Sequence, residues 1–368
     1  MADGANRNDL RDLIARRIEA SGPIGFDEYV AHALYTPGLG FYSGGGGAGR
    51  RRDFLTSPEV GPLFGAVVAK AFDGWWIRAG RPDRFVVVEA GAGPGTLARC
   101  VLAAAPQCKD ALEMILVEPA ETQWSTHPVD VTSRRDLPGP AELGGATVVV
   151  LANELLDNLP FGLVEFTETG WCEVRVGWAD GLVEVLEPLD DGRSAWCRAK
   201  AGGSVDIGAR MPVLADAASW LGDALSLASS ATGGRVVVID YSSTSPQLGR
   251  RPWTEWVRTY SGHGRSGHPL AEPGTCDITV EVAVDQLMSV AEPVSNQTQA
   301  DFLRAHGIDD LVEEGAAKWR EQGIGGGLEA IAGRSRVHEA EALLDPTGLG
   351  AFRVLEWEPG PRSARSDL

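Results

Sequence analysis

A glycine-rich turn between an apolar run and a helical pattern is the feature that most constrains the fold of this chain. Residues 85–88 are apolar without polar alternation, and three of the four are β-branched, which is typical of a strand buried on both faces of a parallel sheet. Gly91, Gly93 and Gly95 follow, and glycines let the backbone turn sharply and let a ligand approach it closely. From Thr96 the apolar residues recur at helical spacing. A strand, a glycine turn and a helix form the first unit of a Rossmann-like nucleotide site.

The charges beside this turn indicate which ligand it holds. Dinucleotide sites usually read G-x-G-x-x-G and place a pyrophosphate at the helix N-terminus. Here the third glycine comes one residue early, at Gly95, and Glu89 precedes the turn. A carboxylate at that position repels a pyrophosphate and favours a cation. S-adenosylmethionine (SAM) carries an ammonium and a sulfonium and has no phosphate.

A second acid supports the same ligand. Glu118 ends the next apolar run, where the ribose-binding carboxylate of such folds belongs. We therefore predict a SAM site formed by Glu89, Gly91, Gly93, Gly95 and Glu118. A dinucleotide site and a glycine turn without any ligand are the alternatives.

Further apolar runs predict more parallel strands, at residues 147–152 and 235–239. Strands that alternate with helices predict a doubly wound sheet, in which ligands bind at the carboxyl ends of the strands. Polar residues follow each predicted strand, and we expect them to gather at one edge of the sheet: Glu89, Glu118, Asn153, Glu154 and Asp240.

The acids after the predicted strand at residues 147–152 suit a particular reaction. Methyl transfer from a sulfonium is an in-line displacement, so the enzyme mainly aligns donor and acceptor. A guanidinium stays protonated, and its methylation calls for carboxylates that grip its N–H groups. Glu154 and Asp157 lie three residues apart, next to Asn153, and we predict these three residues to be catalytic. The alternative is that Asn153 and Asp157 only cap the following turn.

The segment Thr56-Ser57-Pro58-Glu59 predicts a helix start. Ser57 suits the N-cap, Pro58 the first helical position and Glu59 the first turn, and the apolar spacing continues to Trp75. We predict that Thr56, Ser57 and Glu59 face the cofactor; helix capping alone is the alternative.

The remaining patterns divide the whole chain into four expected segments. Residues 8–20 and 26–34 read as helices, and five glycines among residues 44–49 read as a mobile lid, closed by Arg50-Arg51-Arg52. Short β-like runs over 162–188 predict an antiparallel appendage. The expected segments are 1–80 (N-terminal helical cap and lid), 81–161 (first part of the SAM-binding core), 162–232 (inserted β/helical appendage) and 233–368 (remainder of the core, with a long substrate loop at 242–275).

Composition limits the class of protein. The 368 residues allow about two domains, and a net charge of -18 argues against nucleic acid as a partner. Five cysteines without a C-x-x-C pair indicate reduced thiols rather than disulfides or zinc ligands, and no metal-ligand pattern is visible. Without an apolar run of about 20 residues or an apolar segment near Met1, we expect no membrane insertion, no secretory signal and a cytoplasmic location.

Several segments together resemble the MidA-like family of SAM-dependent methyltransferases, which includes the mitochondrial arginine methyltransferase of respiratory complex I assembly. The matching segments are Gly22-Pro23-Ile24 with Phe26 and Tyr29, Leu34-Tyr35 through Phe41-Tyr42, residues 53–59, 89–96 and 152–160, His268 to Gly274 with Asp277-Ile278-Thr279, and residues 350–355. The sequence departs from the family at Arg52, where glycine is usual, and in the 44–49 glycine run.

The resemblance implies an α/β fold: a class I methyltransferase core, Rossmann-like and doubly wound, with an N-terminal helical cap and an inserted antiparallel appendage. It also implies a protein arginine N-methyltransferase acting on a protein substrate, such as a complex I subunit. A non-catalytic SAM-binding assembly factor and a small-molecule methyltransferase are the alternative functions.

Overall fold

The computed structural model describes residues 2–43, 56–229, 233–261, 264–265, 267–322 and 327–360. The predicted lid at 44–49 and the arginine run at 50–52 lie outside these ranges. The chain divides into two compact units. Unit 1 contains Met1–Phe54, Leu156–Gly222 and Ser242–Ala291, and unit 2 contains Leu55–Leu155, Asp223–Tyr241 and Glu292–Leu368. This division differs from the expected segments, because residues 55–80 belong with the main sheet and residues 242–291 do not.

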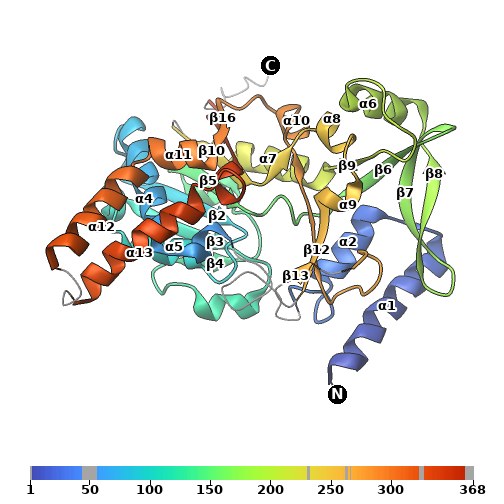
Figure 1. Ribbon diagram of the computed structural model, residues 1–368, viewed down its shortest axis with the longest axis horizontal. Helices are drawn as coiled ribbons and strands as arrows, with labels where there is room; N and C mark the ends of the chain where they lie inside the picture. The colour runs from blue at the N-terminus through green and yellow to red at the C-terminus, as the bar shows by residue number, and fades with distance from the viewer. Residues whose placement is uncertain are drawn as a thin grey trace. The chain divides into compact units, whose positions relative to one another are not determined.

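Unit 2 is built on a seven-stranded sheet with the order β16-β17-β10-β5-β2-β3-β4 (Figure 1). The five strands from β10 to β4 are parallel, and β17 is antiparallel to both of its neighbours. The strands are β2 (Phe85–Ala90), β3 (Leu112–Val117), β4 (Thr132–Arg134), β5 (Thr147–Asn153), β10 (Arg235–Asp240), β16 (Ser295–Thr298) and β17 (Arg353–Trp357). The expected doubly wound, mostly parallel sheet is confirmed.

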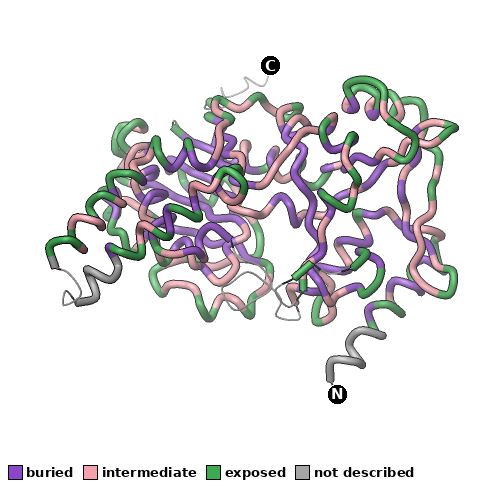
Figure 2. The backbone as a smooth tube through the Cα atoms, viewed as in Figure 1, coloured by how far each residue is buried: buried purple, intermediate pink, exposed green. Residues whose placement is uncertain are grey.

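The uniformly apolar strands are explained by burial on both faces of this sheet (Figure 2). Alternate residues such as Val87, Val149 and Val237 pack in one core with side chains of five helices, and the intervening valines are buried as well. The five helices are α4 (Pro62–Arg78), α5 (Thr96–Ala103), α11 (Gln299–Ala305), α12 (Ile308–Gln322) and α13 (Gly327–Leu343). Helices α12 and α13 were not predicted from the sequence.

The helix expected from Ser57 to Trp75 is broken into two. Thr56, not Ser57, occupies the N-cap of the short helix α3 (Ser57–Val60), and Gly61 separates it from α4. The break has a local cause, because Pro62 disfavours the helical conformation of the residue before it. A tertiary contact accompanies it: the buried carboxylate of Glu339 accepts a hydrogen bond from the Leu63 N–H at 2.8 Å. A Cβ atom on Gly61 would lie 2.2 Å from the Glu339 carboxyl carbon, so any other residue there would force this carboxylate to move.

Unit 1 combines the N-terminal helices α1 (Ala2–Ser21) and α2 (Phe26–Tyr35) with an antiparallel sheet of order β1-β7-β6-β9, in which β8 also pairs with β7. The expected N-terminal helices and antiparallel β runs are therefore present. The strands are β1 (Ile24–Gly25), β6 (Gly162–Thr167), β7 (Gly170–Trp178), β8 (Leu182–Pro188) and β9 (Arg210–Val213). Helix α6 (Asp191–Ala201) follows β8, and α7 (Ala215–Ala228) leads along the chain from unit 1 into unit 2.

The segment 242–275, expected to be a long loop, contains short regular elements. They are β11 (Ser242–Ser243), α8 (Ser245–Leu248), α9 (Trp253–Trp256), β12 (Val257–Ser261) and β13 (Gly264–Arg265). After them come β14 (Asp277–Val280), β15 (Val282–Ala283) and α10 (Val284–Met288). Backbone pairing of β12 with β14 and of β11 with β15 holds this segment within unit 1.

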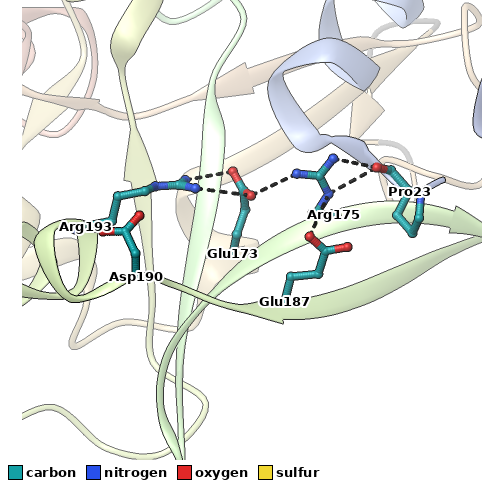
Figure 3. Close-up of polar contacts among 6 residues, drawn as sticks. All are labelled: Pro23, Glu173, Arg175, Glu187, Asp190 and Arg193. Carbon is teal, nitrogen blue, oxygen red and sulfur yellow. Dashed lines mark hydrogen bonds and ion pairs between the residues drawn. The ribbon is translucent and has the colours of Figure 1, made fainter. Parts of the chain in front are cut away.

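A charged network ties the start of the chain to the antiparallel sheet (Figure 3). Glu173 on β7 accepts hydrogen bonds from Arg193 at 2.8 Å and from Arg175 at 3.1 Å, and Arg175 also donates to the Pro23 carbonyl oxygen. Burial alone would raise the pKa of Glu173, but the two arginines outweigh it and lower that pKa. Glu173 therefore stays ionised between two cations.

We expect Glu173→Gln to lower the free energy of unfolding by about 1 kcal/mol at pH 7, because it removes the carboxylate from two charge-assisted hydrogen bonds. Since the folded-state pKa of Glu173 is lowered, its contribution is present above the ordinary value of 4.5 and is lost as pH falls through the folded value. Urea unfolding at pH 7 and at pH 3 measures this. Glu168→Gln, at an exposed turn of the same sheet, is the control; equal loss in both variants at pH 7 would contradict the assignment.

Candidate functional site

The functional site is expected where the order of the main sheet reverses. From β2 the chain continues to β3 and β4 on one side, whereas β5 lies on the other side of β2. The parallel registers bring the carboxyl ends of β3, β2, β5 and β10 to the same level. Ligands of open α/β sheets bind at such a point. The predicted gathering of polar residues at this edge is confirmed for Glu89, Glu118, Asn153, Glu154 and Asp240.

The glycine turn follows β2 at this point. Gly91, Gly93 and Gly95 have φ angles of 71°, 49° and 71°, which favour glycine. A Cβ atom on Gly91 would lie 2.9 Å from Leu155, and one on Gly95 would lie 3.1 Å from His127, so both glycines are closely packed. A Cβ atom on Gly93 would meet no atom of the described residues within 4 Å, its chain neighbours aside. Of the three, Gly93 is therefore the glycine that leaves open space for a ligand.

Glu89 lies inside β2 and is 4% exposed. Its Oε2 atom has no hydrogen-bond partner among the described residues. Burial raises the pKa of Glu89 to about 8, although the charge of Arg99 and the Ala98 N–H favour the ionised form. A buried carboxyl group with an unused oxygen suits a cationic ligand better than a phosphate.

We expect binding of S-adenosylhomocysteine, which retains the ammonium group, to release a proton from Glu89. The carboxyl group is protonated below pH 8 in the free protein, and a bound cation favours its ionised form, so affinity rises with pH. Between pH 6 and pH 8 the gain should be roughly 10- to 100-fold, at up to tenfold per pH unit.

Calorimetry in buffers of different ionisation enthalpy measures the released proton. Glu89→Gln is the matched control, because it leaves the ligand's own titration in place. If proton release persists unchanged in Glu89→Gln, Glu89 is not the titrating group.

Glu118 follows β3 and holds the glycine turn in place. Its Oε2 accepts a hydrogen bond from the Gly93 N–H at 3.0 Å, and its Oε1 accepts one from the Ala120 N–H at 2.8 Å. Burial raises the pKa of Glu118, while these two hydrogen bonds favour the carboxylate. Contact with a ribose stays a prediction for this residue.

The Thr56–Glu59 segment is joined to two parts of the site. The Ser57 N–H donates to Glu154 Oε1 at 2.9 Å, and the Thr96 hydroxyl donates to Glu59 Oε1 at 2.6 Å. Thr56 and Ser57 are buried. The segment therefore bridges the end of β5 and the first turn of α5. Direct contact of Thr56, Ser57 or Glu59 with a cofactor stays a prediction.

Glu154 adopts a conformation that is rare for its residue type. Its φ angle is 53°, in the left-handed region, and such strain is concentrated at functional sites. Its N–H donates to the Ile239 carbonyl oxygen at 2.8 Å, and its Oε1 also accepts from Asn153 Nδ2 at 3.1 Å. Burial raises the pKa of Glu154 to about 7, although the hydrogen bonds from Ser57 and Asn153 favour the carboxylate.

Asp157 belongs to unit 1, whereas Asn153 and Glu154 belong to unit 2. Asp157 is 5% exposed, and its backbone carbonyl accepts a hydrogen bond from the Val280 N–H at 2.9 Å. The next residue, Asn158, donates to Asp277 at 3.0 Å. A joint grip of Glu154 and Asp157 on one substrate stays a prediction.

Two residues near the site were not predicted. The buried side chain of Gln299, at the start of α11, accepts a hydrogen bond from the Ser57 hydroxyl at 3.1 Å. His127 lies within hydrogen-bond distance of Gly93. Neither residue directly follows an apolar run, and the acids were predicted only from their positions after such runs, so no sequence signal indicated these two residues.

Within the described ranges, no group of three or more His, Cys, Asp or Glu side chains could hold a metal ion. None of the described helices is long and apolar enough to cross a membrane.

Comparisons with known proteins find similar methyltransferases. A 29% identical relative, covering 82% of this chain and 73% of its own, is the bovine (Bos taurus) mitochondrial protein arginine methyltransferase NDUFAF7. A 27% identical relative from Drosophila melanogaster, the NDUFAF7 homolog of the same description, covers 99% of this chain and 88% of its own.

A solved structure from Burkholderia thailandensis, with S-adenosyl-homocysteine bound, superimposes with a TM-score of 0.80 at 25% identity. It covers 98% of this chain and 94% of its own chain.

The residues at the strand ends fit SAM: Gly93 borders open space, and the buried Glu89 has an unpartnered carboxyl oxygen among the described residues, which suits a cation better than a phosphate. The family model described as "Putative S-adenosyl-L-methionine-dependent methyltransferase" matches residues 67–302, more than half of the chain. The chain therefore belongs to this family of SAM-dependent methyltransferases.

Proposed function

We propose that this protein is a protein arginine N-methyltransferase whose substrate is a subunit of respiratory complex I. The observation that carries the proposal is Glu154, a half-buried carboxylate held by Ser57 and Asn153 at the end of β5. The relatives are named protein arginine methyltransferases, which supports an arginine acceptor.

The residue chemistry supports the same acceptor. SAM supplies an electrophilic methyl group when bound. A guanidinium keeps its proton at neutral pH, so its nitrogen has to be oriented and polarised by a carboxylate. Glu154 Oε1 is already occupied by two donors, which orient the carboxylate. We propose that Glu154 Oε2 accepts the guanidinium N–H, with Asp157 as the second carboxylate.

Comparative methyl-proteomics of cells with and without this protein tests the proposal. We expect methylated arginine on a complex I subunit to disappear on deletion and to return with the wild-type gene but not with Glu154→Gln. SAM binding without turnover on any lysate protein would favour a non-catalytic assembly factor. A methylated metabolite that is present only in wild-type extracts would favour a small-molecule methyltransferase. The expected cytoplasmic location is tested by fractionating the same cells.

A further inference from the structure

Both backbone polar atoms of Gly93 are held by side chains. Glu118 accepts from the Gly93 N–H at 3.0 Å, and His127 Nε2 lies 2.8 Å from the Gly93 carbonyl oxygen. A carbonyl oxygen only accepts, so Nε2 carries the hydrogen and donates it. The other ring nitrogen, Nδ1, lies 2.7 Å from the Ser133 hydroxyl, which supplies the hydrogen for that contact when His127 is neutral. We call Glu118 and His127 the Gly93 clamp.

The segment that carries His127 also contacts the neighbours of Gly93. The Pro94 carbonyl oxygen accepts hydrogen bonds from the Thr126 hydroxyl at 3.0 Å and from Arg99 at 2.6 Å. The His127 ring packs against Gly95, since a Cβ atom there would lie 3.1 Å from its Cδ2 atom. The glycine turn is therefore fastened along three successive residues.

The clamp is itself anchored to the sheet. His127 follows the short 3-10 helix η2 (Glu121–Thr126), and the Trp124 indole in that helix donates to the Glu118 carbonyl oxygen at 2.9 Å. Ser133, the partner of His127, lies in β4, which pairs with β3. The elements next to β2 in the sheet thus fix the position of the turn that follows β2.

We propose that His127 is a positioning residue for the cofactor: through its Nε2–H it holds the Gly93 carbonyl, and with Glu118 it keeps the open side of Gly93 ready for SAM. This inference rests on the proposed place of the cofactor at the glycine turn. Gly93, at a φ of 49°, can adopt many backbone conformations because it is a glycine. Binding would have to offset the conformational entropy lost when this backbone is ordered, unless it is already ordered in the free protein. His127 thereby acts on cofactor affinity without touching the methyl acceptor.

His127→Leu and His127→Gln test the clamp. Leucine fills the volume without a donor, whereas the glutamine amide can place an N–H near the position of Nε2. We expect the Kd for S-adenosylhomocysteine, by calorimetry, to rise about tenfold in His127→Leu, equivalent to about 1.4 kcal/mol, and less than threefold in His127→Gln. Amide exchange of residues 91–96 should accelerate in His127→Leu and not in His127→Gln. His338→Leu, at an exposed histidine of α13, is the control and should leave both quantities unchanged.

Each outcome decides between the clamp and the cofactor position. Wild-type affinity in His127→Leu together with lost affinity in Gly93→Val overturns the clamp and leaves the cofactor at the turn. Wild-type affinity in both overturns the cofactor position as well. A loss in His127→Gln as large as in His127→Leu overturns the role of the Nε2–H. If His127→Leu does not fold, Ser133→Ala replaces it: a two- to threefold rise in Kd supports the clamp, and no change overturns it.

Discussion

Gly93→Val is expected to weaken binding of S-adenosylhomocysteine by more than about 100-fold while the protein stays folded. Apart from its chain neighbours, no described residue has an atom within 4 Å of the position of the added Cβ, so the valine side chain would enter the open space that we assign to the cofactor. The left-handed φ of 49° adds strain of about 1–2 kcal/mol, which a protein of ordinary stability tolerates. Calorimetry measures the affinity, and circular dichroism measures the fold.

Gly80→Val separates backbone strain from occlusion of the site. Gly80 also has a left-handed φ, of 85°, and open space at its Cβ position, but it lies in an exposed turn after α4. This variant should bind S-adenosylhomocysteine like the wild type. Unchanged affinity in Gly93→Val would refute the assignment of the turn to the cofactor, and binding of NADH would restore the dinucleotide alternative.

Glu154→Gln is expected to slow methyl transfer by roughly 10- to 100-fold with little change in SAM affinity. A charge-assisted hydrogen bond contributes about 1.5–3 kcal/mol, and about 1.36 kcal/mol corresponds to a factor of ten in rate. The pKa of Glu154 is about 7 and the carboxylate is the active form, so the wild-type rate should rise as pH increases to about 7 and then level off. The rate of the variant should lack this rise with pH. Initial rates on the proposed complex I substrate, measured from pH 6 to pH 9, give both quantities.

Three further variants show whether a loss of activity in Glu154→Gln comes from the proposed role of this carboxylate. Glu113→Gln changes an exposed carboxylate at the opposite end of the same sheet and should keep full activity. Glu154→Gly removes the carboxylate and also relieves backbone strain of about 1–2 kcal/mol, so this variant should stay folded. If it is as stable as the wild type and inactive, the loss of activity comes from the missing carboxylate. Asp157→Asn should match Glu154→Gln if both acids grip the substrate, and should have a mild effect if Asp157 only caps the turn. Full activity in Glu154→Gln would exclude the proposed role, and lost SAM binding would place Glu154 in the cofactor site.

Much of the main sheet could be predicted because its signals are local. A strand without polar alternation, such as β2 or β5, has to be buried on both faces, and consecutive apolar residues are enough to predict it. The carboxyl ends of parallel strands meet at one edge, so the gathering of Glu89, Glu118 and Glu154 followed from their places after apolar runs. A signal for α12 was also present, in Ile308, Leu311 and Val312 at helical spacing.

The contacts that shape the site are not local. Ser57 and Glu154 are 97 residues apart, and Thr96 and Glu59 are 37 residues apart. The break at Gly61 was signalled locally by Pro62, which disfavours the helical conformation of the residue before it, but the hydrogen bond from Leu63 to Glu339 of α13 was not. Distant partners of this kind become visible only when the chain is folded.

The sequence by itself determined the parallel sheet, the glycine turn and the acids at its edge, because strand burial and backbone freedom act over a few residues. Only the tertiary structure decided that Gly93, among the three glycines, borders open space and that His127 and Glu118 hold its backbone. It also decided that Glu154 is strained and half-buried, with a raised pKa. Packing density, burial and the direction of a hydrogen bond depend on segments that only folding brings together, and these quantities set the chemistry of the site.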